Sequence, residues 1–132
     1  MAIQHTPDDN ERRDVHLDVD PETAIFSTSG GYSEHMLVNL GKKRLAIKIK
    51  CSDIDLFRVD PVFVFIEPGE CTNLVIKRFR STTAKQDRLV LHHMACEHTE
   101  TNIPALFNRV DNTAAVQKYR LSLKCYPPGQ SP

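Results

Sequence analysis

The stretch between residues 32 and 94 constrains the fold most, because apolar residues recur there at every second position between short turn signals. Residues 45–51 show the pattern best: one side of the stretch carries Leu45, Ile47, Ile49 and Cys51. Lys48 and Lys50 fall on the other side. Successive side chains of a strand point to opposite faces, so a period of two indicates a strand with one buried face. The chain is expected to fold mainly as β-sheet.

Three turn signals divide this stretch. Gly41-Lys42-Lys43 separates residues 35–40 from residues 44–51 and predicts a hairpin with a three-residue loop. In Val59-Asp60-Pro61 the proline lacks a ladder donor, which predicts an edge strand or a change of sheet. Glu67-Pro68-Gly69-Glu70 has proline and glycine at the positions that a type II turn demands.

Further strands are predicted on both sides. Residues 15–20 alternate until Pro21 and read as an edge strand, and residues 88–94 are apolar on both faces, as in a central strand. Residues 117–126 supply the last strand. Seven or eight strands without a long amphipathic helix predict an all-β fold, an immunoglobulin-like seven-stranded β-sandwich.

Strand signals vanish between residues 97 and 114. Pro104 can open a helix, and the apolar residues that follow at helical spacing are Ile103, Leu106, Phe107 and Val110. One or two helical turns are expected to close an end of the sandwich, and contact with a partner is the alternative.

Length and charge limit the organisation and the partners. The 132 residues suit one domain: a flexible lead-in at 1–14, the sandwich at 15–127 and a tail at 128–132. Seventeen basic and seventeen acidic residues leave no net charge, so the chain has no overall positive field that would attract nucleic acid. No apolar run approaches the roughly 18 residues of a membrane span, and residues 1–10 lack the centre of a secretion signal. A cytoplasmic protein without membrane insertion is expected.

The four cysteines are expected to be free thiols, with no disulfide. A protein with a full-sized hydrophobic core does not need disulfide bonds for its stability, and a reducing compartment keeps thiols reduced. Cys51 and Cys125 fall on the apolar side of their strands, where cysteine packs as a small hydrophobe. The cysteine and histidine spacings do not match those of zinc sites, so neither a metal nor another cofactor is expected.

No catalytic residue is predicted. His92 and His93 are adjacent on a strand and point to opposite faces, so they cannot converge on one reacting atom. One of them is expected to be buried and the other exposed. No nucleophile, base and orienting group occur together in a local signature, and a protein without enzymatic activity is expected.

Short motifs add a family resemblance over residues 15–127. Val59-Asp60-Pro61, Ile66-Glu67-Pro68 and Asp87-Arg88-Leu89 occur in the order and spacing of similar tripeptides in the major sperm protein (MSP) domain. Residues 45–51 resemble that family's basic strand, although Cys51-Ser52 replaces its two threonines. The resemblance implies an MSP/PapD-like sandwich that binds other proteins.

The resemblance implies a first functional hypothesis. Nematode major sperm proteins form dimers that assemble into filaments, and small sperm-specific proteins share the domain. The chain is therefore expected to be a structural or regulatory component of the sperm filament system. Its partners would be a second copy of itself, in a homodimer, or other MSP-domain proteins.

The alternative hypothesis is a peptide receptor. Receptors of the family at the endoplasmic reticulum bind acidic peptides that carry two phenylalanines, and Lys50, Arg88 and Val90 approximately match their contact positions. Lys48 and Ser52 lie on the same predicted strand face. Asp53 and Asp55 would repel an acidic ligand, and an ordinary solvated lysine face is the competing interpretation.

Overall fold

The structure is a computed structural model that describes residues 13–110, 113 and 115–130. Within these residues it has nine strands and one helix, and their bounds are β1 Leu17–Asp20, β2 Thr23–Ser27, β3 Gly31–Asn39, β4 Leu45–Cys51, β5 Phe57–Asp60, β6 Phe63–Ile66, β7 Cys71–Arg78, β8 Asp87–Ala95, α1 Ile103–Val110 and β9 Gln117–Tyr126. Most of the predicted lead-in, residues 1–12, lies outside the described residues, as do residues 131 and 132 of the tail.

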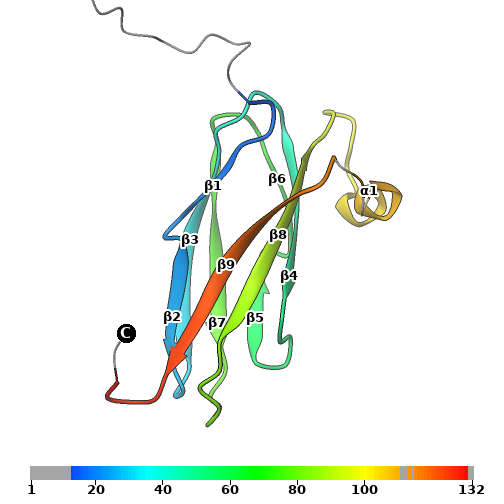
Figure 1. Ribbon diagram of the computed structural model, residues 1–132. Helices are drawn as coiled ribbons and strands as arrows, with labels where there is room; N and C mark the ends of the chain where they lie inside the picture. The colour runs from blue at the N-terminus through cyan, green and yellow to red at the C-terminus, as the bar shows by residue number, and fades with distance from the viewer. Residues whose placement is uncertain (1–12, 111–112, 114, 131–132) are drawn as a thin grey trace, which may run out of the picture.

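The strands form the predicted all-β sandwich of two sheets (Figure 1). One sheet has four strands in the order β1-β3-β7-β5, and the other has five in the order β2-β9-β8-β4-β6. Strands β2 and β9 are parallel, and the other neighbours are antiparallel. β8 is central and β1 lies at an edge, which confirms both predictions.

The described strands number nine instead of the seven predicted, because the chain changes sheet at two prolines. β1 and β2 flank Pro21 and belong to different sheets, and β5 and β6 do the same around Pro61. Proline cannot donate to a ladder, so each is tolerated where an edge strand leaves its sheet. The predicted change of sheet at Pro61 is confirmed.

The predicted hairpin at Gly41-Lys42-Lys43 is wrong. β3 belongs to the four-stranded sheet and β4 to the five-stranded one, so the loop crosses between sheets. Alternation within each strand does not reveal which strand is its neighbour. Gly41 is needed here for space, because a Cβ at this position would lie 2.5 Å from the backbone oxygen of Asp14.

Asn39 connects this crossover loop to a later place where the chain changes sheet, between β6 and β7. Its side chain is fully buried; Nδ2 donates to the backbone oxygens of Lys43 (2.8 Å) and Ile66 (2.9 Å), while Oδ1 accepts from the N–H of Gly41 (3.0 Å). The backbone of Asn39 bonds to Gly69 and Glu70, in the turn between β6 and β7. In this turn Glu70 N–H donates to Glu67 O and Gly69 has a φ of 79°, as the type II prediction requires.

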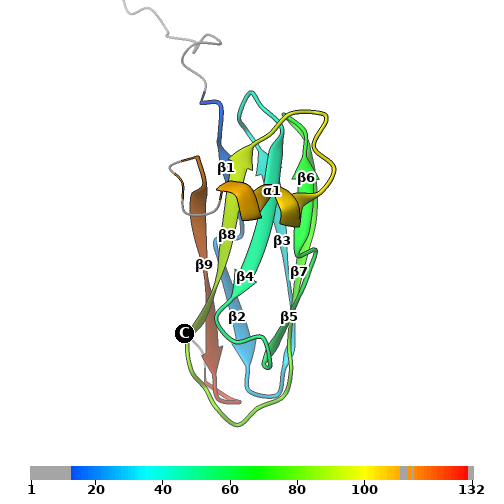
Figure 2. The ribbon, with the colours of Figure 1, turned by 90° about the vertical axis from the view of Figure 1, so that its right-hand side faces the viewer.

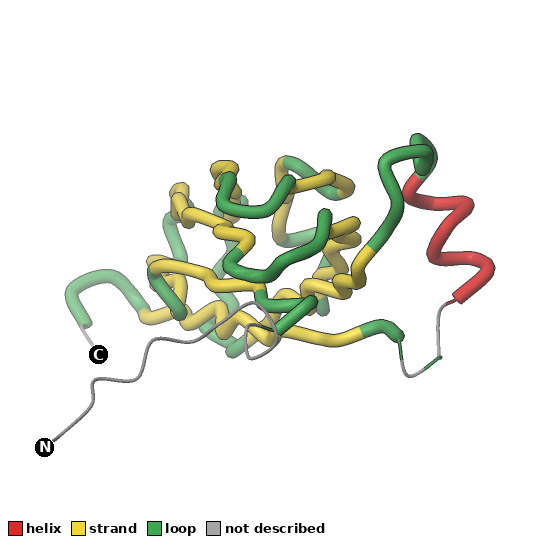
Figure 3. The backbone as a smooth tube through the Cα atoms, turned by 90° about the horizontal axis from the view of Figure 1, so that it is seen from above, coloured by secondary structure: helices red, strands yellow, loops and turns green. Residues whose placement is uncertain are grey.

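The inward faces of both sheets form the main core, and α1 makes a second one. Ile103, Leu106 and Phe107 of the helix pack with Ala46 and Met94 on the outer face of the five-stranded sheet. Asn102 caps the helix by accepting from the N–H of Ala105. The helical segment is confirmed, but it covers a sheet face (Figure 2) and lies outside the two strand layers (Figure 3) instead of closing an end.

The helix covers part of the sheet face on which His92 lies. Both His92 and His93 are therefore buried, and the prediction that one of them is exposed is wrong. His93 points into the main core, where its Nδ1–H donates to the backbone oxygen of Leu91 (2.9 Å). Burial lowers the pKa of His93, so the ring is neutral at physiological pH. His92 points to the opposite face, which α1 partly covers.

All four cysteines are free thiols. Cys125 is buried in its strand, Cys71 is exposed at the start of β7, and the other two are intermediate. Burial raises the pKa of the Cys51 and Cys96 thiols. The four sites therefore differ in access, and Cys51 and Cys96 also have a smaller thiolate fraction, which slows alkylation.

The Asn39→Ala variant should lose about 3 kcal/mol of unfolding free energy, because it leaves two carbonyls and one N–H of the crossovers without their partner. Urea denaturation measures this loss. Asn73→Ala, at an exposed position of β7, is the matched control and should change stability by less than about 0.5 kcal/mol. Equal stability of the two variants would contradict the role of Asn39.

Alkylation of the native protein should modify Cys71 first, Cys51 and Cys96 more slowly, and Cys125 only after denaturant is added. Iodoacetamide labelling followed by peptide mass spectrometry gives the order. Cys71→Ser should remove the fast phase and leave the slow ones. Labelling of Cys125 as fast as that of Cys71 in native buffer would show that the buried assignment is wrong.

Candidate functional site

The outer face of the five-stranded sheet gathers basic side chains from three adjacent strands. They are Lys48 and Lys50 from β4, Arg88 from β8, and Lys118, Arg120 and Lys124 from β9. Over their described lengths, these strands place no aspartate or glutamate on that face at the alternating outward positions. We call these six residues the basic face; it is a local positive region on a chain without net charge.

The centre of the basic face is a row across three strands. Lys50 pairs with Val90, and Val90 pairs with Arg120. Both cations are exposed and Val90 is half-buried between them. Neighbouring strands lie about 4.8 Å apart, so two cations flank one apolar side chain within a short distance. The structure thus brings together the predicted residues Lys50 and Val90.

Ser52 and Arg88, also predicted, are joined through the backbone. The Ser52 hydroxyl donates to Asp87 (2.8 Å) and accepts from the N–H of Arg88 (3.0 Å). The N–H of Ser52 donates to the oxygen of Arg88 (3.0 Å). Ser52 therefore fixes the start of β8 and leaves the exposed guanidinium of Arg88 on the basic face.

Lys85 neutralises two carboxylates beside this site. Its Nζ lies 2.8 Å from Asp87 and 3.0 Å from Asp53. The hydrogen bond from Lys85 lowers the pKa of the Asp53 carboxyl, and the bonds to Asp87 and then Asp53 raise the pKa of Lys85. The repulsion that the sequence predicts from Asp53 is therefore reduced, and Asp55 is left as an exposed acid of that loop.

Lys48 differs from the other predicted residues. It is half-buried, pairs with His92, and its Nζ lies 5.6 Å from the centre of the Phe107 ring. The helix covers this end of the sheet, so Lys48 belongs to the boundary of the basic face. The interpretation as an ordinary solvated lysine face therefore fits Lys50 but not Lys48.

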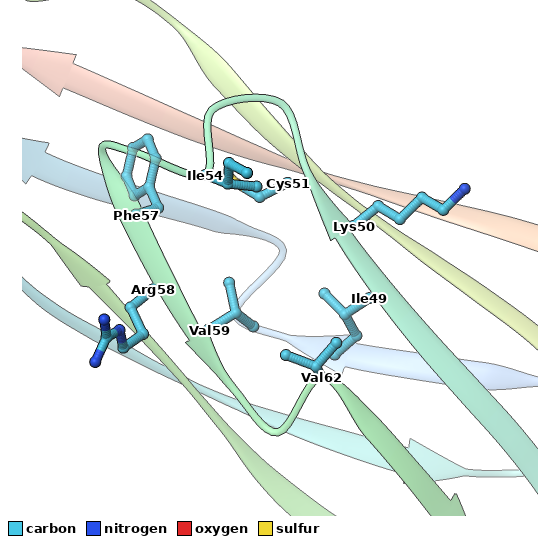
Figure 4. A pocket seen from close by; sticks show the side chains of 8 residues that line it. All are labelled: Ile49, Lys50, Cys51, Ile54, Phe57, Arg58, Val59 and Val62. Atoms are coloured by element: carbon cyan, nitrogen blue, oxygen red, sulfur yellow. The ribbon is translucent and has the colours of Figure 1, made fainter. Parts of the chain in front are cut away.

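An apolar pocket of about 500 Å³ adjoins the basic face (Figure 4). β6 pairs only with Leu45–Lys48, so the rest of β4 lies beyond it and faces β5 of the other sheet. The pocket opens between them and is lined by Ile49, Lys50, Cys51, Ile54, Phe57, Arg58, Val59 and Val62. Its volume lies within the usual range of ligand pockets, about 300–1,000 Å³.

Lys50 connects the pocket with the basic face. In Figure 4 the apolar side chains gather between β4 and β5, while Lys50 and Arg58 extend away from them on opposite sides. Ile54 is 79% exposed and Val62 is 43% exposed, so apolar surface is available at the pocket mouth. The arrangement suits a segment that places a bulky apolar side chain beside carboxylates.

Several site residues were not predicted from the sequence. Lys118, Arg120 and Lys124 alternate with the apolar residues of the last strand, and this alternation would have revealed them. Only the pairing of β9 with β8 places them beside Lys50. The pocket residues Ile54, Phe57 and Val62 come from segments whose approach depends on the change of sheet at Pro61.

The described residues give little indication of other chemistry. No three histidine, cysteine, aspartate or glutamate side chains among them are grouped as metal ligands would be. Nor does any helix within residues 13–110, 113 and 115–130 have the length and apolar character of a membrane span.

Comparison with known proteins gives consistent similarities. A family model described as the MSP (major sperm protein) domain matches residues 16–116. Sperm-specific class P protein 10 of Caenorhabditis elegans is 34% identical over 102 residues, which are 77% of this chain and 93% of that protein. The solved structure of WR4, a C. elegans MSP family member, has 29% identity and a TM-score of 0.76, covering 83% of this chain and 97% of its own.

One relative is longer. An uncharacterized protein of C. elegans is 36% identical over 104 residues, which are 79% of this chain and 53% of that protein. The chain thus spans about half the length of this relative.

Proposed function

Because the chain belongs to the major sperm protein domain family, we propose that it is a non-catalytic interaction module whose basic face binds an acidic segment of a partner protein. The observation that carries the proposal is the position of Lys50, which borders both the basic face and the apolar pocket. One extended segment can therefore contact both.

The two parts of the site have different roles in this proposal. Lys50, Arg88 and Arg120 attract carboxylates, and among the described residues none of the three has a carboxylate within ion-pairing distance. The attraction increases the association rate and is screened by salt. The pocket takes an aromatic or large aliphatic side chain, whose burial supplies affinity that salt does not weaken.

The setting we propose is the nematode sperm cytoplasm, in which the protein is a structural or regulatory component of the filament system. The similarity to a sperm-specific class P protein supports this setting. The four free cysteines fit a reducing compartment. The partner is then another MSP-domain protein, a second copy of the chain, or a protein with an acidic segment.

A labelled acidic peptide with two phenylalanines should bind saturably, and its affinity should fall as salt rises. Lys50→Glu and Arg120→Glu should each weaken binding about tenfold or more, because each replaces an attraction by a repulsion. Lys43→Glu makes the same change of charge in the distant crossover loop and should alter the affinity less than about twofold. Fluorescence anisotropy measures all four proteins.

Two results would contradict the proposed site. One is the lack of saturation by the peptide into the millimolar range. The other is an equal loss of affinity in Lys43→Glu and Lys50→Glu, which would show that the peptide responds to overall charge. Replacement of both phenylalanines by alanine tests the pocket separately, and unchanged binding would exclude its use.

Sedimentation equilibrium tests the structural role. If the protein builds filaments itself, its weight-average mass should rise with concentration above the 15.0 kDa of one chain. A strict monomer at high concentration would exclude self-assembly and leave the regulatory role, in which the protein binds filament subunits without adding to them.

A further inference from the structure

The outer face of the four-stranded sheet, opposite the basic face, carries a cluster of exposed rings and cations. Tyr32 of β3, Lys77 of β7 and Arg58 of β5 form one row across the sheet. Lys77 Nζ lies 5.6 Å from the centre of the Tyr32 ring and 5.0 Å from that of Phe79. The Arg58 guanidinium lies 5.9 Å from the Phe79 ring. We call these four residues the aromatic–cation cluster.

The two cations of this cluster lack an acidic partner within the described part of the chain. Neither Lys77 nor Arg58 lies within ion-pairing distance of a carboxylate among the described residues. The rings hold both cations in place through the negative faces of their π systems. They therefore reduce the side-chain entropy that a bound carboxylate would otherwise have to remove.

The rings are also accessible. Tyr32 is 67% exposed and Phe79 is 36% exposed. Tyrosine and arginine are enriched among the residues that dominate binding energy at protein interfaces. An apolar side chain of a partner can cover Tyr32 while a carboxylate reaches Lys77, so the cluster offers both kinds of contact in one place.

We propose that the aromatic–cation cluster is a second binding surface for a short acidic segment of a partner protein. The charges around it define the size of the ligand. Glu34 and Asp60 lie on the same sheet face, two residues along β3 and β5 from Tyr32 and Arg58. Both acids lie in the adjoining row, on either side of Val75, and border the cluster from one direction. A short segment with one or two carboxylates fits on Lys77 and Arg58 without covering them.

A nucleic acid or another long polyanion that followed the strands over Glu34 and Asp60 would be repelled by them. The same acids make a phosphate-rich surface a poor ligand. The geometry favours a protein segment in which a carboxylate and an apolar side chain are close in the chain.

Two acid-binding surfaces on opposite sheets would make one domain bivalent. The basic face belongs to the five-stranded sheet and the cluster to the four-stranded sheet, and Arg58, which also lines the pocket, is where the two sites adjoin. A domain of this kind links two partner chains, and the gain in avidity requires no further contact.

Isothermal titration with the labelled peptide used for the basic face tests the proposal. The wild-type protein should bind two peptides per chain. Lys77→Glu should remove one of them, Lys50→Glu should remove the other, and the double variant should bind neither. Lys43→Glu is the matched control and should keep both. Because Tyr32 is exposed, Tyr32→Ala should weaken the second site without altering the thermal unfolding midpoint.

The outcomes separate this proposal from that of the basic face. One peptide per wild-type chain, lost in Lys50→Glu and kept in Lys77→Glu, would overturn the second surface alone. One peptide that is lost only in Lys77→Glu would support it and overturn the basic face. If Lys77→Glu does not fold, Lys77→Gln replaces it in the test, because glutamine removes the charge and has a side chain of similar size. Two peptides bound with unchanged affinity to Lys77→Gln would then also overturn the proposal. Tighter binding of an oligonucleotide than of the peptide at this surface would contradict the ligand class.

Discussion

The buried amide of Asn39 is the interaction on which the arrangement of the two sheets depends. It bonds to the loop that follows β3 and to the end of β6, and so it ties together two of the places where the chain crosses between sheets. A buried amide without partners is costly, whereas here both its nitrogen and its oxygen are bonded. The same residue also bonds through its backbone to the turn before β7. The two crossovers are thus joined at one end of the sandwich through a single residue.

The change of sheet at Pro61 also creates the pocket proposed for binding. At Pro61 the chain leaves the four-stranded sheet after β5 and enters the five-stranded sheet as β6, which covers only the first half of β4. The remaining half of β4 faces β5 across the open side of the sandwich, and the pocket forms there. A sheet of full-length strands would close this side. The pocket is therefore a consequence of the change of sheet at Pro61, and Lys50 joins it to the basic face.

Short-range sequence patterns predicted much of the fold. Most of what they did not predict concerns which strands pair with one another. The period of two in residues 45–51, the proline at position 61 and the helical spacing after Pro104 each report on the residues themselves, so these elements were predictable. The partner of a strand is a long-range property, which is why the hairpin at Gly41 was wrongly predicted. The same limit applies to the site: Lys50 and Val90 could be proposed from sequence, but Arg120 joins them only through the β8–β9 ladder.

The absence of net charge hides a strong segregation of charges, and this segregation bears most directly on recognition. Lys85 holds Asp53 and Asp87, and Arg44 lies 3.1 Å from Glu67, so these acids are paired outside the basic face. Lys50, Arg88 and Arg120 have no such partner among the described residues. Since charges farther apart than a Debye length of about 8 Å are screened at physiological salt, a ligand responds to the charges close to it and not to the total. A chain without net charge can therefore present a local positive surface to an acidic partner.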